Sequence, residues 1–214
     1  MNPSIADIRK TYAQSQLSES DTVSNPIEQF KKWWEEAVHA QIDEVNAMTL
    51  ATIDENGMPD ARIVLLKGLE ENGFVFYTNY LSRKGQQLTL HPKAALVFFW
   101  KELERQVRVH GLVERIVESE SDAYFHSRPR ESQLGAVSSP QSQVIDDRAW
   151  LESRYQEVEA SFEGKEIERP THWGGYRLVA ESVEFWQGRP GRMHDRIEYK
   201  KDPSGSWFRQ RLAP

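Results

Sequence analysis

Apolar residues first recur at helical spacing and then at alternate positions, which predicts one helix followed by strands. Asn25 can cap a helix that begins at Pro26, and the spacing extends this helix over residues 26–42. Its apolar face comprises Ile27, Phe30, Trp34, Ala37, Val38 and Ile42. Alternation then predicts three strands separated by Asn-Gly turns, at 47–54, 61–69 and 74–78. We expect these three strands to form an antiparallel meander.

The rest of the chain mixes short helices with further strands. Helices are predicted at 82–90, 119–127, 130–136 and 146–162. Strands are predicted at 94–100, 105–117, 175–186, 192–200 and 207–212, the last three as a closing meander. Together these elements predict a mainly β, antiparallel fold with peripheral helices. We expect the strands to close into a small β-barrel, because closure removes exposed strand edges.

The N-terminal residues are more polar than the rest of the chain. Residues 1–24 are expected to form a mobile arm that has little to bury and contains a possible helix at 5–16. Residues 25–214 show no linker or internal repeat and are predicted to form a single domain.

Composition narrows the class of protein. The longest apolar stretch, residues 94–100, is too short to cross a bilayer, and no signal peptide is recognised, so a cytoplasmic protein without a membrane partner is expected. A net charge of −6 argues against nucleic-acid binding. The chain has no cysteine and six scattered histidines, so neither disulfides nor a metal site are expected.

A short basic segment near the C-terminus is a candidate site. In an extended chain Arg192, His194 and Arg196 share one face, and two guanidinium groups beside an imidazole suit an anionic ligand. Trp186 offers a flat apolar plate just upstream. The alternative is a solvated, arginine-rich edge strand.

The segment from Arg62 to Lys67 is an apolar strand with a cation at each end. Because Arg62 and Lys67 differ in parity, a regular strand would direct them to opposite faces. One shared ligand would therefore require a bulge or two ligand groups. The alternative is a core strand with solvated ends.

Two further clusters could bind phosphate. Tyr77 and Thr78 end a strand before Ser82, Arg83 and Lys84, which begin a helix, and free backbone N–H groups beside cations bind anions. An ordinary serine cap is the alternative.

The second cluster comprises Tyr124, Arg128 and Ser132, which share a helical face if the helix continues past Pro129. On another strand Gln106 lies on the face of Arg108 and His110, either to bond a heterocycle edge or simply as a polar sheet face.

The chain contains no Rossmann fingerprint, P-loop, nucleophile elbow or metalloprotease motif. Two candidate phosphate clamps, flat aromatics and no protein nucleophile therefore point to a bound cofactor that supplies the reactivity.

Seven segments in order resemble the pyridoxamine 5'-phosphate oxidase family. They are Arg62–Lys67, Phe76–Asn79, Ser82–Lys84, Leu103–Val107, Tyr124–Arg130, Trp173–Gly175 and the Glu-Phe-Trp-Gln and Arg-Met-His-Asp-Arg parts of Glu184–Arg196. The resemblance covers the chain from about residue 25 to its end. It implies an FMN-binding split β-barrel that works as a homodimer with FMN at the subunit interface.

The resemblance also implies the site residues. FMN contacts are expected at Arg62, Ile63, Val64, Leu65, Leu66, Lys67, Tyr77, Thr78, Arg83, Lys84, Gln106, Gln141, Ser142, Trp186 and Arg196. Substrate contacts are expected at Lys67, Tyr124, Arg128, Ser132, Arg192 and His194, the last two being the catalytic candidates. The N-terminal Arg9-Lys-Thr-Tyr12 resembles a segment that can close over the substrate.

The implied reaction is FMN-dependent oxidation of pyridoxamine or pyridoxine 5'-phosphate to pyridoxal 5'-phosphate, with O2 as acceptor and hydrogen peroxide as product. Two alternatives remain open: another split-barrel flavin reductase, or a non-catalytic flavin or pyridoxal-phosphate binding module.

Overall fold

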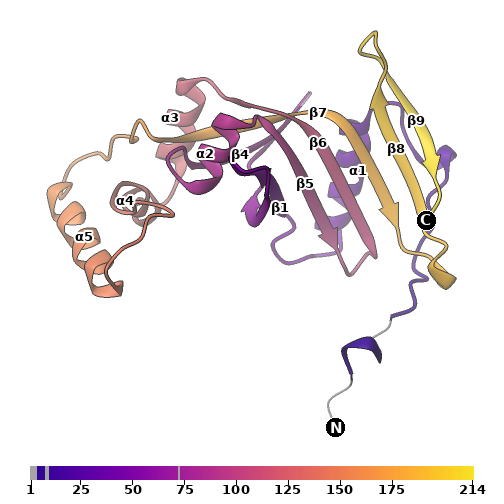
Figure 1. Cartoon of the computed structure of the whole chain (residues 1–214), viewed down its shortest axis with the longest axis horizontal. Helices are drawn as coiled ribbons and strands as arrows, with labels where there is room; N and C mark the ends of the chain where they lie inside the picture. The colour runs from indigo at the N-terminus through magenta and orange to yellow at the C-terminus, as the bar shows by residue number, and fades with distance from the viewer. Residues whose placement is uncertain (1–3, 8–9, 72) are drawn as a thin grey trace. The chain divides into compact units, whose positions relative to one another are not determined.

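The computed structural model of the chain describes residues 4–7, 10–71 and 73–214. The strands are β1 (Ala47–Ile53), β2 (Pro59–Leu65), β3 (Gly68–Glu70), β4 (Gly73–Asn79), β5 (Lys93–Trp100), β6 (Arg105–Arg115), β7 (Trp173–Gln187), β8 (Asp195–Lys201) and β9 (Trp207–Leu212) (Figure 1). The helices are α1 (Pro26–His39), α2 (Arg83–Leu90), α3 (Glu118–Ser127), α4 (Arg130–Ser138) and α5 (Arg148–Ser161). The strand order is β2-β1-β5-β6-β7-β4-β3, and β8 and β9 extend from β7.

The chain divides into two compact units, each assembled from segments distant in sequence. The first unit comprises Met1–Leu50, Ala95–Gly111 and Ala180–Pro214, and the second comprises Ala51–Ala94 and Leu112–Val179. Strands β1, β5, β6 and β7 contribute residues to both units. The prediction of a single domain over residues 25–214 stays a prediction.

Helix α1 supplies much of the aromatic core of the first unit. Its cap is as predicted, since the Asn25 side chain accepts hydrogen bonds from the Ile27 and Glu28 amides. Phe30 is fully buried, with its ring centroid 4.9 Å from that of Phe98 and 5.9 Å from that of Trp100.

Three details of α1 differ from the prediction. The helix ends at His39 rather than at residue 42, because the chain turns through Gln41, which has a φ of 53°. Trp33 rather than Trp34 is the buried tryptophan, and its ring meets the ring of Phe185 edge-on at 5.1 Å. Val38, predicted to face the core, is exposed.

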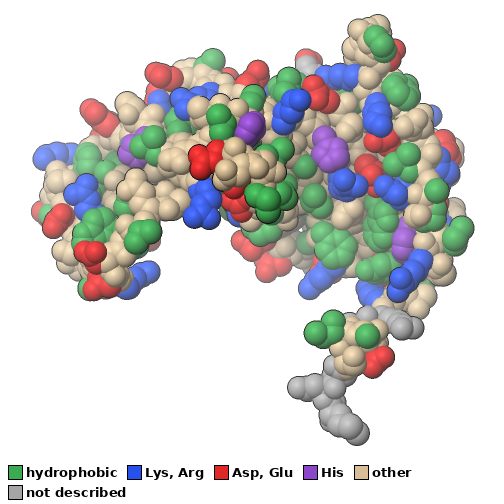
Figure 2. Space-filling view, viewed as in Figure 1, with side chains coloured by type: hydrophobic (Ala, Val, Ile, Leu, Met, Phe, Trp, Pro, Cys, Tyr) green, Lys and Arg blue, Asp and Glu red, His purple; other side chains and the backbone are tan. Residues whose placement is uncertain are grey.

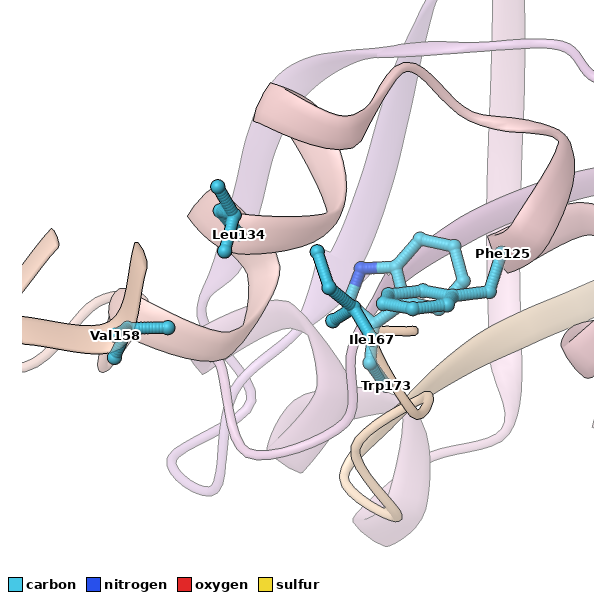
Figure 3. Close-up of a cluster of buried hydrophobic side chains, with 5 residues drawn as sticks. All are labelled: Phe125, Leu134, Val158, Ile167 and Trp173. Carbon is cyan, nitrogen blue, oxygen red and sulfur yellow. The ribbon is translucent and has the colours of Figure 1, made fainter. Parts of the chain in front are cut away.

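The second unit has its own core beneath helices α3, α4 and α5. The side chains of this cluster, drawn in Figure 3, come from α3, α4, α5, the segment that leads into β7 and the first residue of β7. They are Phe125, Leu134, Val158, Ile167 and Trp173. Trp173 thus anchors the start of β7 against the helices.

The prediction of one continuous strand over residues 61–69 is wrong, because this segment belongs to two strands. Strand β2 ends at Leu65, and the short β3 begins at Gly68 and pairs antiparallel with β4. Strand β4 pairs with β3 and β7 instead of completing a meander with β1 and β2. The closing meander is confirmed, since β7 pairs antiparallel with β8, and β8 with β9.

The N-terminal arm buries more than predicted. The possible helix at 5–16 appears only as a single 3-10 turn at Ile5–Asp7, because residues 10–16 are not helical and residues 8–9 lie outside the described residues. Leu17 and Thr22 are buried in the first unit. The mobility of the arm stays a prediction.

The surface carries mixed charge. On the face shown in Figure 2, acidic and basic side chains are interspersed rather than gathered by sign. Among the described helices, none combines the length and apolar character that crossing a membrane requires.

Candidate active site

A cavity of about 340 Å³ in the second unit gathers most of the predicted site residues of that unit. It is lined by Arg62, Ile63, Val64, Leu65, Lys67, Tyr77, Thr78, Lys84, Tyr124, Arg128, Gln141 and Trp173. Four of these side chains are cationic and two are phenols, so the cavity is suited to an anionic ligand with an aromatic or other flat part.

The break between β2 and β3 explains how Arg62 and Lys67 reach one cavity despite their opposite parity. The chain leaves the strand after Leu65, Leu66 turns into the core, and the Lys67 amide donates to the carbonyl oxygen of Val75 at 2.8 Å. The alternation of a regular strand therefore does not apply to Lys67. The sequence led us to expect a bulge or two ligand groups, and the structure shows an interrupted strand instead.

Arg62 is fixed by three neighbours in the second unit. Its guanidinium donates to Thr52 Oγ1 at 2.5 Å and to Gln87 Oε1 at 3.1 Å, and it pairs with Asp60 at 2.6 Å. Gln87 in turn donates to Asp60 at 3.0 Å. These contacts hold the guanidinium in one orientation at the cavity wall, which reduces the entropy lost when a ligand binds.

Lys84 approaches the cavity from the first turn of α2. Its ammonium donates to Thr78 Oγ1 at 3.3 Å, and the Thr78 hydroxyl lies 3.4 Å from Gln141 Oε1. Burial lowers the pKa of Lys84, and the positive charge of Arg62 lowers it further, while Asp60 acts in the opposite direction. An anion in the cavity would relieve this repulsion between cations.

Three aromatic rings form a stack on one wall of the cavity. The ring centroid of Tyr77 lies 3.8 Å from that of Tyr124 and 5.6 Å from that of Trp173, with interplanar angles of 19° and 14°. Burial raises the pKa of Tyr77 to about 12 and also raises the pKa of Tyr124. Both phenols therefore stay protonated and can donate hydrogen bonds to a ligand at neutral pH.

Arg128 presents a buried guanidinium nitrogen at the cavity. Its guanidinium lies over the Trp173 ring, 4.6 Å from the centroid, and burial lowers its pKa. The Nη1 atom is buried and has no hydrogen-bond partner among the described residues. Because a buried, unbonded cationic nitrogen costs free energy, the geometry fits a ligand such as a phosphate that would accept its hydrogen bonds.

The two separate helices predicted at 119–127 and 130–136 are observed, so the condition under which Tyr124, Arg128 and Ser132 would share one helical face is not met. Helix α3 ends at Ser127, Arg128 has extended backbone angles, and α4 begins only at Arg130. Pro129 causes the break because its preceding residue disfavours the helical region. Tyr124 and Arg128 line the cavity nonetheless, whereas Ser132 does not.

Other predicted cofactor contacts lie beside the cavity rather than on it. Arg83 is exposed and lines a different cavity with acidic neighbours, among them Asp54 and Asp60. Leu66 is buried, and Ser142 is exposed with a φ of 72°. The roles of Leu66, Arg83, Ser132 and Ser142 stay predictions.

The first unit contains the remaining predicted residues. Trp186 on β7 pairs in register with Arg196 on β8, and its ring centroid lies 4.6 Å from that of His194. His194 Nδ1 accepts the backbone N–H of Arg189 at 3.1 Å, so a neutral imidazole carries its proton on Nε2.

The expected alignment of Arg192, His194 and Arg196 on one extended face is wrong. Residues 190–192 form a 3-10 turn, and Arg192 has a φ of 62°, so β8 begins only at Asp195. The turn at Pro190 and Gly191 interrupts the strand alternation. Arg192 is exposed, while His194 and Arg196 are partly buried.

Arg196 is held by a carboxylate that the sequence did not suggest. Its Nε and Nη2 atoms donate to the two oxygens of Glu184 at 2.9 and 3.0 Å, and this pair raises the pKa of Arg196. Arg108 also donates to Glu184, at 3.3 Å.

Gln106 lies on the same partly buried face of β6 as Arg108, and Val107 between them is fully buried. The predicted alternation along this strand is therefore confirmed.

The sequence did not identify Trp173 as lining a cavity, and it did not show which residues Tyr12 contacts. Trp173 belongs to a recognised motif, but only its place in the stack identifies it as a cavity wall. Tyr12 lies against Trp186 and His194, a contact that separation in sequence conceals. Over residues 4–7, 10–71 and 73–214, no group of three or more His, Cys, Asp or Glu side chains is placed to hold a metal ion.

Comparison with known proteins agrees with the resemblance in sequence. Residues 34–162 match the family described as "Pyridoxamine 5'-phosphate oxidase", and residues 173–214 match "Pyridoxine 5'-phosphate oxidase C-terminal dimerisation region". The chain is 57% identical to a pyridoxine/pyridoxamine 5'-phosphate oxidase 1 from Ralstonia nicotianae over 99% of both chains. It is 54% identical to a pyridoxine/pyridoxamine 5'-phosphate oxidase from Leptospira interrogans over 100% of both.

A solved structure is also similar. The crystal structure of PhzG from Burkholderia lata, in complex with tetrahydrophenazine-1-carboxylic acid, matches with a TM-score of 0.88 and 30% identity, covering 94% of this chain and 99% of that one. This likeness confirms the predicted fold class, an antiparallel split β-barrel with peripheral helices. The match to the dimerisation region supports a homodimer. The chain belongs to the pyridoxamine 5'-phosphate oxidase family.

Proposed function

We propose that this protein oxidises pyridoxine 5'-phosphate and pyridoxamine 5'-phosphate to pyridoxal 5'-phosphate. The alcohol and O2 give the aldehyde and hydrogen peroxide, and the amine consumes one water in addition and releases ammonia. Bound FMN would supply the chemistry by accepting two electrons from the substrate and passing them to O2. Full-length relatives at 57% and 54% identity bear the name of this activity.

The observation that supports the proposal most directly is the cavity of the second unit. It combines the cations Arg62, Lys67, Lys84 and Arg128 with an aromatic stack, and the buried Nη1 of Arg128 has no hydrogen-bond partner in the part of the chain that the structure describes. Both FMN and the substrate are flat heterocycles that carry a phosphate. The chemistry of the lining residues therefore fits both ligands.

The residues of the cavity divide between the two ligands in this proposal. Arg62 and Lys84 would bind the FMN phosphate, with the Thr78 hydroxyl and the Gln141 amide beside them. Trp186, Gln106 and Arg196 would contact the flavin rings, as would Ile63, Val64 and Leu65 through their position along β2.

Lys67, Tyr124, Arg128 and Ser132 would hold the substrate phosphate, and their task is positioning, which lowers the entropic part of the barrier. Arg192 and His194 would contact the substrate ring. With Nδ1 accepting from Arg189, His194 presents Nε2 as the nitrogen free to donate to or receive a proton from the substrate.

We further propose that FMN lies at the subunit interface of the homodimer and that the protein is cytoplasmic. The dimerisation region at residues 173–214 includes Trp186, Arg192, His194 and Arg196. Proposed cofactor and substrate contacts therefore belong to the segment associated with dimerisation.

The test is to load the purified homodimer with FMN and measure O2 consumption and peroxide release with each substrate. The proposal expects one peroxide per pyridoxal 5'-phosphate formed from either substrate. A protein that binds FMN without consuming O2 in the presence of either substrate would refute it. Such a protein would support a binding module, and flavin reduction by a nicotinamide donor would support a reductase.

A further inference from the structure

Glu104 has an unusual backbone conformation at a buried position in the first unit. It lies between β5 and β6 with a φ of 54°, in the left-handed region that non-glycine residues seldom adopt. Its carbonyl oxygen accepts the backbone N–H of Gly188 at 2.8 Å and the Nε2 of Gln187 at 3.2 Å. Strained conformations of this kind persist where the surroundings hold them, and they concentrate at functional sites.

The side chain of Glu104 is only 2% exposed, and the N-terminal segment supplies its hydrogen-bond partners. Its Oε2 atom accepts the backbone N–H groups of Ala13 at 2.8 Å and Gln14 at 3.1 Å, and Oε1 lies 3.4 Å from Lys10 Nζ. Burial raises the pKa of Glu104, but these hydrogen bonds lower it by more, so the net pKa lies below its usual value. The carboxylate is therefore ionised at neutral pH, and its bonds to the segment are charge-assisted.

The segment held by Glu104 places Tyr12 on two proposed site residues. The Tyr12 ring centroid lies 5.7 Å from that of Trp186, edge-on, and 6.0 Å from that of His194. Gly188 makes the space for this ring, because a Cβ built there would lie 2.7 Å from Tyr12 Cγ. Tyr12 therefore occupies a slot that any larger residue at position 188 would close.

A second attachment fixes the other end of the same segment. The Leu17 amide donates to Asp195 Oδ2 at 3.0 Å, and the Leu17 side chain is buried. Asp195 directly follows His194 in sequence. The segment is thus attached on both sides of Tyr12, and its position depends on two carboxylates.

We propose that Glu104 is a positioning residue that holds Tyr12 against Trp186 and His194 and so completes the wall of the substrate site. The role of Tyr12 at the substrate rests on the proposed function, whereas the attachment by Glu104 rests on contacts within the first unit. Replacing the Glu104 carboxylate by a neutral amide takes away the charge that strengthens its hydrogen bonds to the segment. We expect this change to raise the KM for pyridoxine 5'-phosphate about 10- to 100-fold, with kcat changed less than about threefold.

The experiment compares Glu104→Gln with Glu102→Gln in the FMN-loaded homodimer. Glu102 lies in the same turn, but its side chain is 48% exposed and pairs only with Lys101 among the described residues, so it is a matched control. The first measurement is the rate of chymotrypsin cleavage after Tyr12, followed by mass spectrometry. Glu104→Gln should accelerate this cleavage at least tenfold, and Glu102→Gln should leave it unchanged.

The second measurement is KM and kcat for pyridoxine 5'-phosphate. Unchanged cleavage after Tyr12 in Glu104→Gln would overturn the attachment, and faster cleavage with an unchanged KM would overturn the positioning role. If the wild-type protein oxidises neither substrate, the proposed function fails, while the cleavage rates still decide the attachment.

Gly188→Ala provides an independent route to the same result. It displaces Tyr12 from its slot while leaving the Glu104 carboxylate in place, so it should raise both the cleavage rate and KM. This variant decides the proposal if Glu104→Gln does not fold, and unchanged cleavage and KM in Gly188→Ala would contradict it.

Discussion

Replacing Arg128 by Met should have opposite effects on the empty and the liganded protein. In the absence of ligand, Nη1 is buried and no described residue accepts a hydrogen bond from it, a cost of about 1–3 kcal/mol that the substitution removes. The substitution also removes the contact with Trp173, at 4.6 Å from the ring centroid, which stabilises by about 0.5–2 kcal/mol. These terms nearly cancel, and Met fills much of the same volume. The free energy of unfolding should therefore change by less than about 1 kcal/mol.

Binding of a phosphate-bearing ligand should be affected much more. A charge-assisted hydrogen bond contributes about 1.5–3 kcal/mol, so Arg128→Met should raise the Kd for pyridoxal 5'-phosphate about 10- to 150-fold. The assay pairs urea unfolding of the FMN-free protein with a fluorescence titration of pyridoxal 5'-phosphate.

Arg130→Met is the matched control for this substitution. Its guanidinium donates to the carbonyl oxygens of Lys165 at 3.0 Å and Phe162 at 2.6 Å, away from the cavity lining. It should lower stability and leave the Kd unchanged. If Arg128→Met instead destabilised the empty protein by more than about 2 kcal/mol and left the Kd unchanged, Arg128 would be a structural cation and the reasoning would be refuted.

Three further predictions concern other parts of the molecule. Glu184→Gln should raise the Kd for FMN about tenfold, because it weakens the bidentate pair that orients Arg196; an unchanged Kd in a fluorescence-quenching titration would contradict this. Gly85→Ala should lower the free energy of unfolding by more than about 2 kcal/mol in urea, since a Cβ there would overlap the carbonyl oxygen of Tyr80, and a smaller loss would show that α2 can shift. Burial raises the pKa of Tyr77 to about 12, above its value of about 10 in the unfolded chain. The buried neutral phenol therefore contributes to the free energy of unfolding fully below a pH of about 10, and this contribution is lost as the pH rises through about 12. Wild-type stability should therefore fall more steeply than that of Tyr77→Phe in this interval, and parallel curves would argue against the burial of this phenol.

Local sequence signals predicted the elements well where a single residue determines the local geometry. Asn25 caps α1 as expected, and Pro129 ends the continuity between α3 and α4. The break after Leu65 was not predicted, because the apolar run continues to Leu66 and the interruption depends on the pairing of Gly68 with Val75. Such pairing is a tertiary contact that local pattern does not encode.

Prediction of the site depended on the resemblance more than on spacing. Physical reasoning placed Arg192 in line with Arg196, which the structure contradicts, and it did not decide how Arg62 and Lys67 could serve one ligand. The resemblance assigned both residues to ligand contacts; both line the cavity of the second unit, and their contacts with ligands stay predictions. Glu184 was not predicted as a partner of Arg196, because a buried carboxylate between two arginines is visible only once β7 and β8 are paired.

The stack of Tyr77, Tyr124 and Trp173 also has a consequence for how the protein acquires its ligands during folding. These rings come from β4, α3 and β7, so the wall that they form requires contacts between residues almost 100 positions apart in sequence. Contacts of such long range form late, since loop-closure entropy opposes them until neighbouring structure exists. Adding FMN or pyridoxal 5'-phosphate during refolding should therefore leave the folding rate unchanged and slow only unfolding. Ligands bound in this cavity would therefore increase the kinetic stability of the folded protein without assisting its folding.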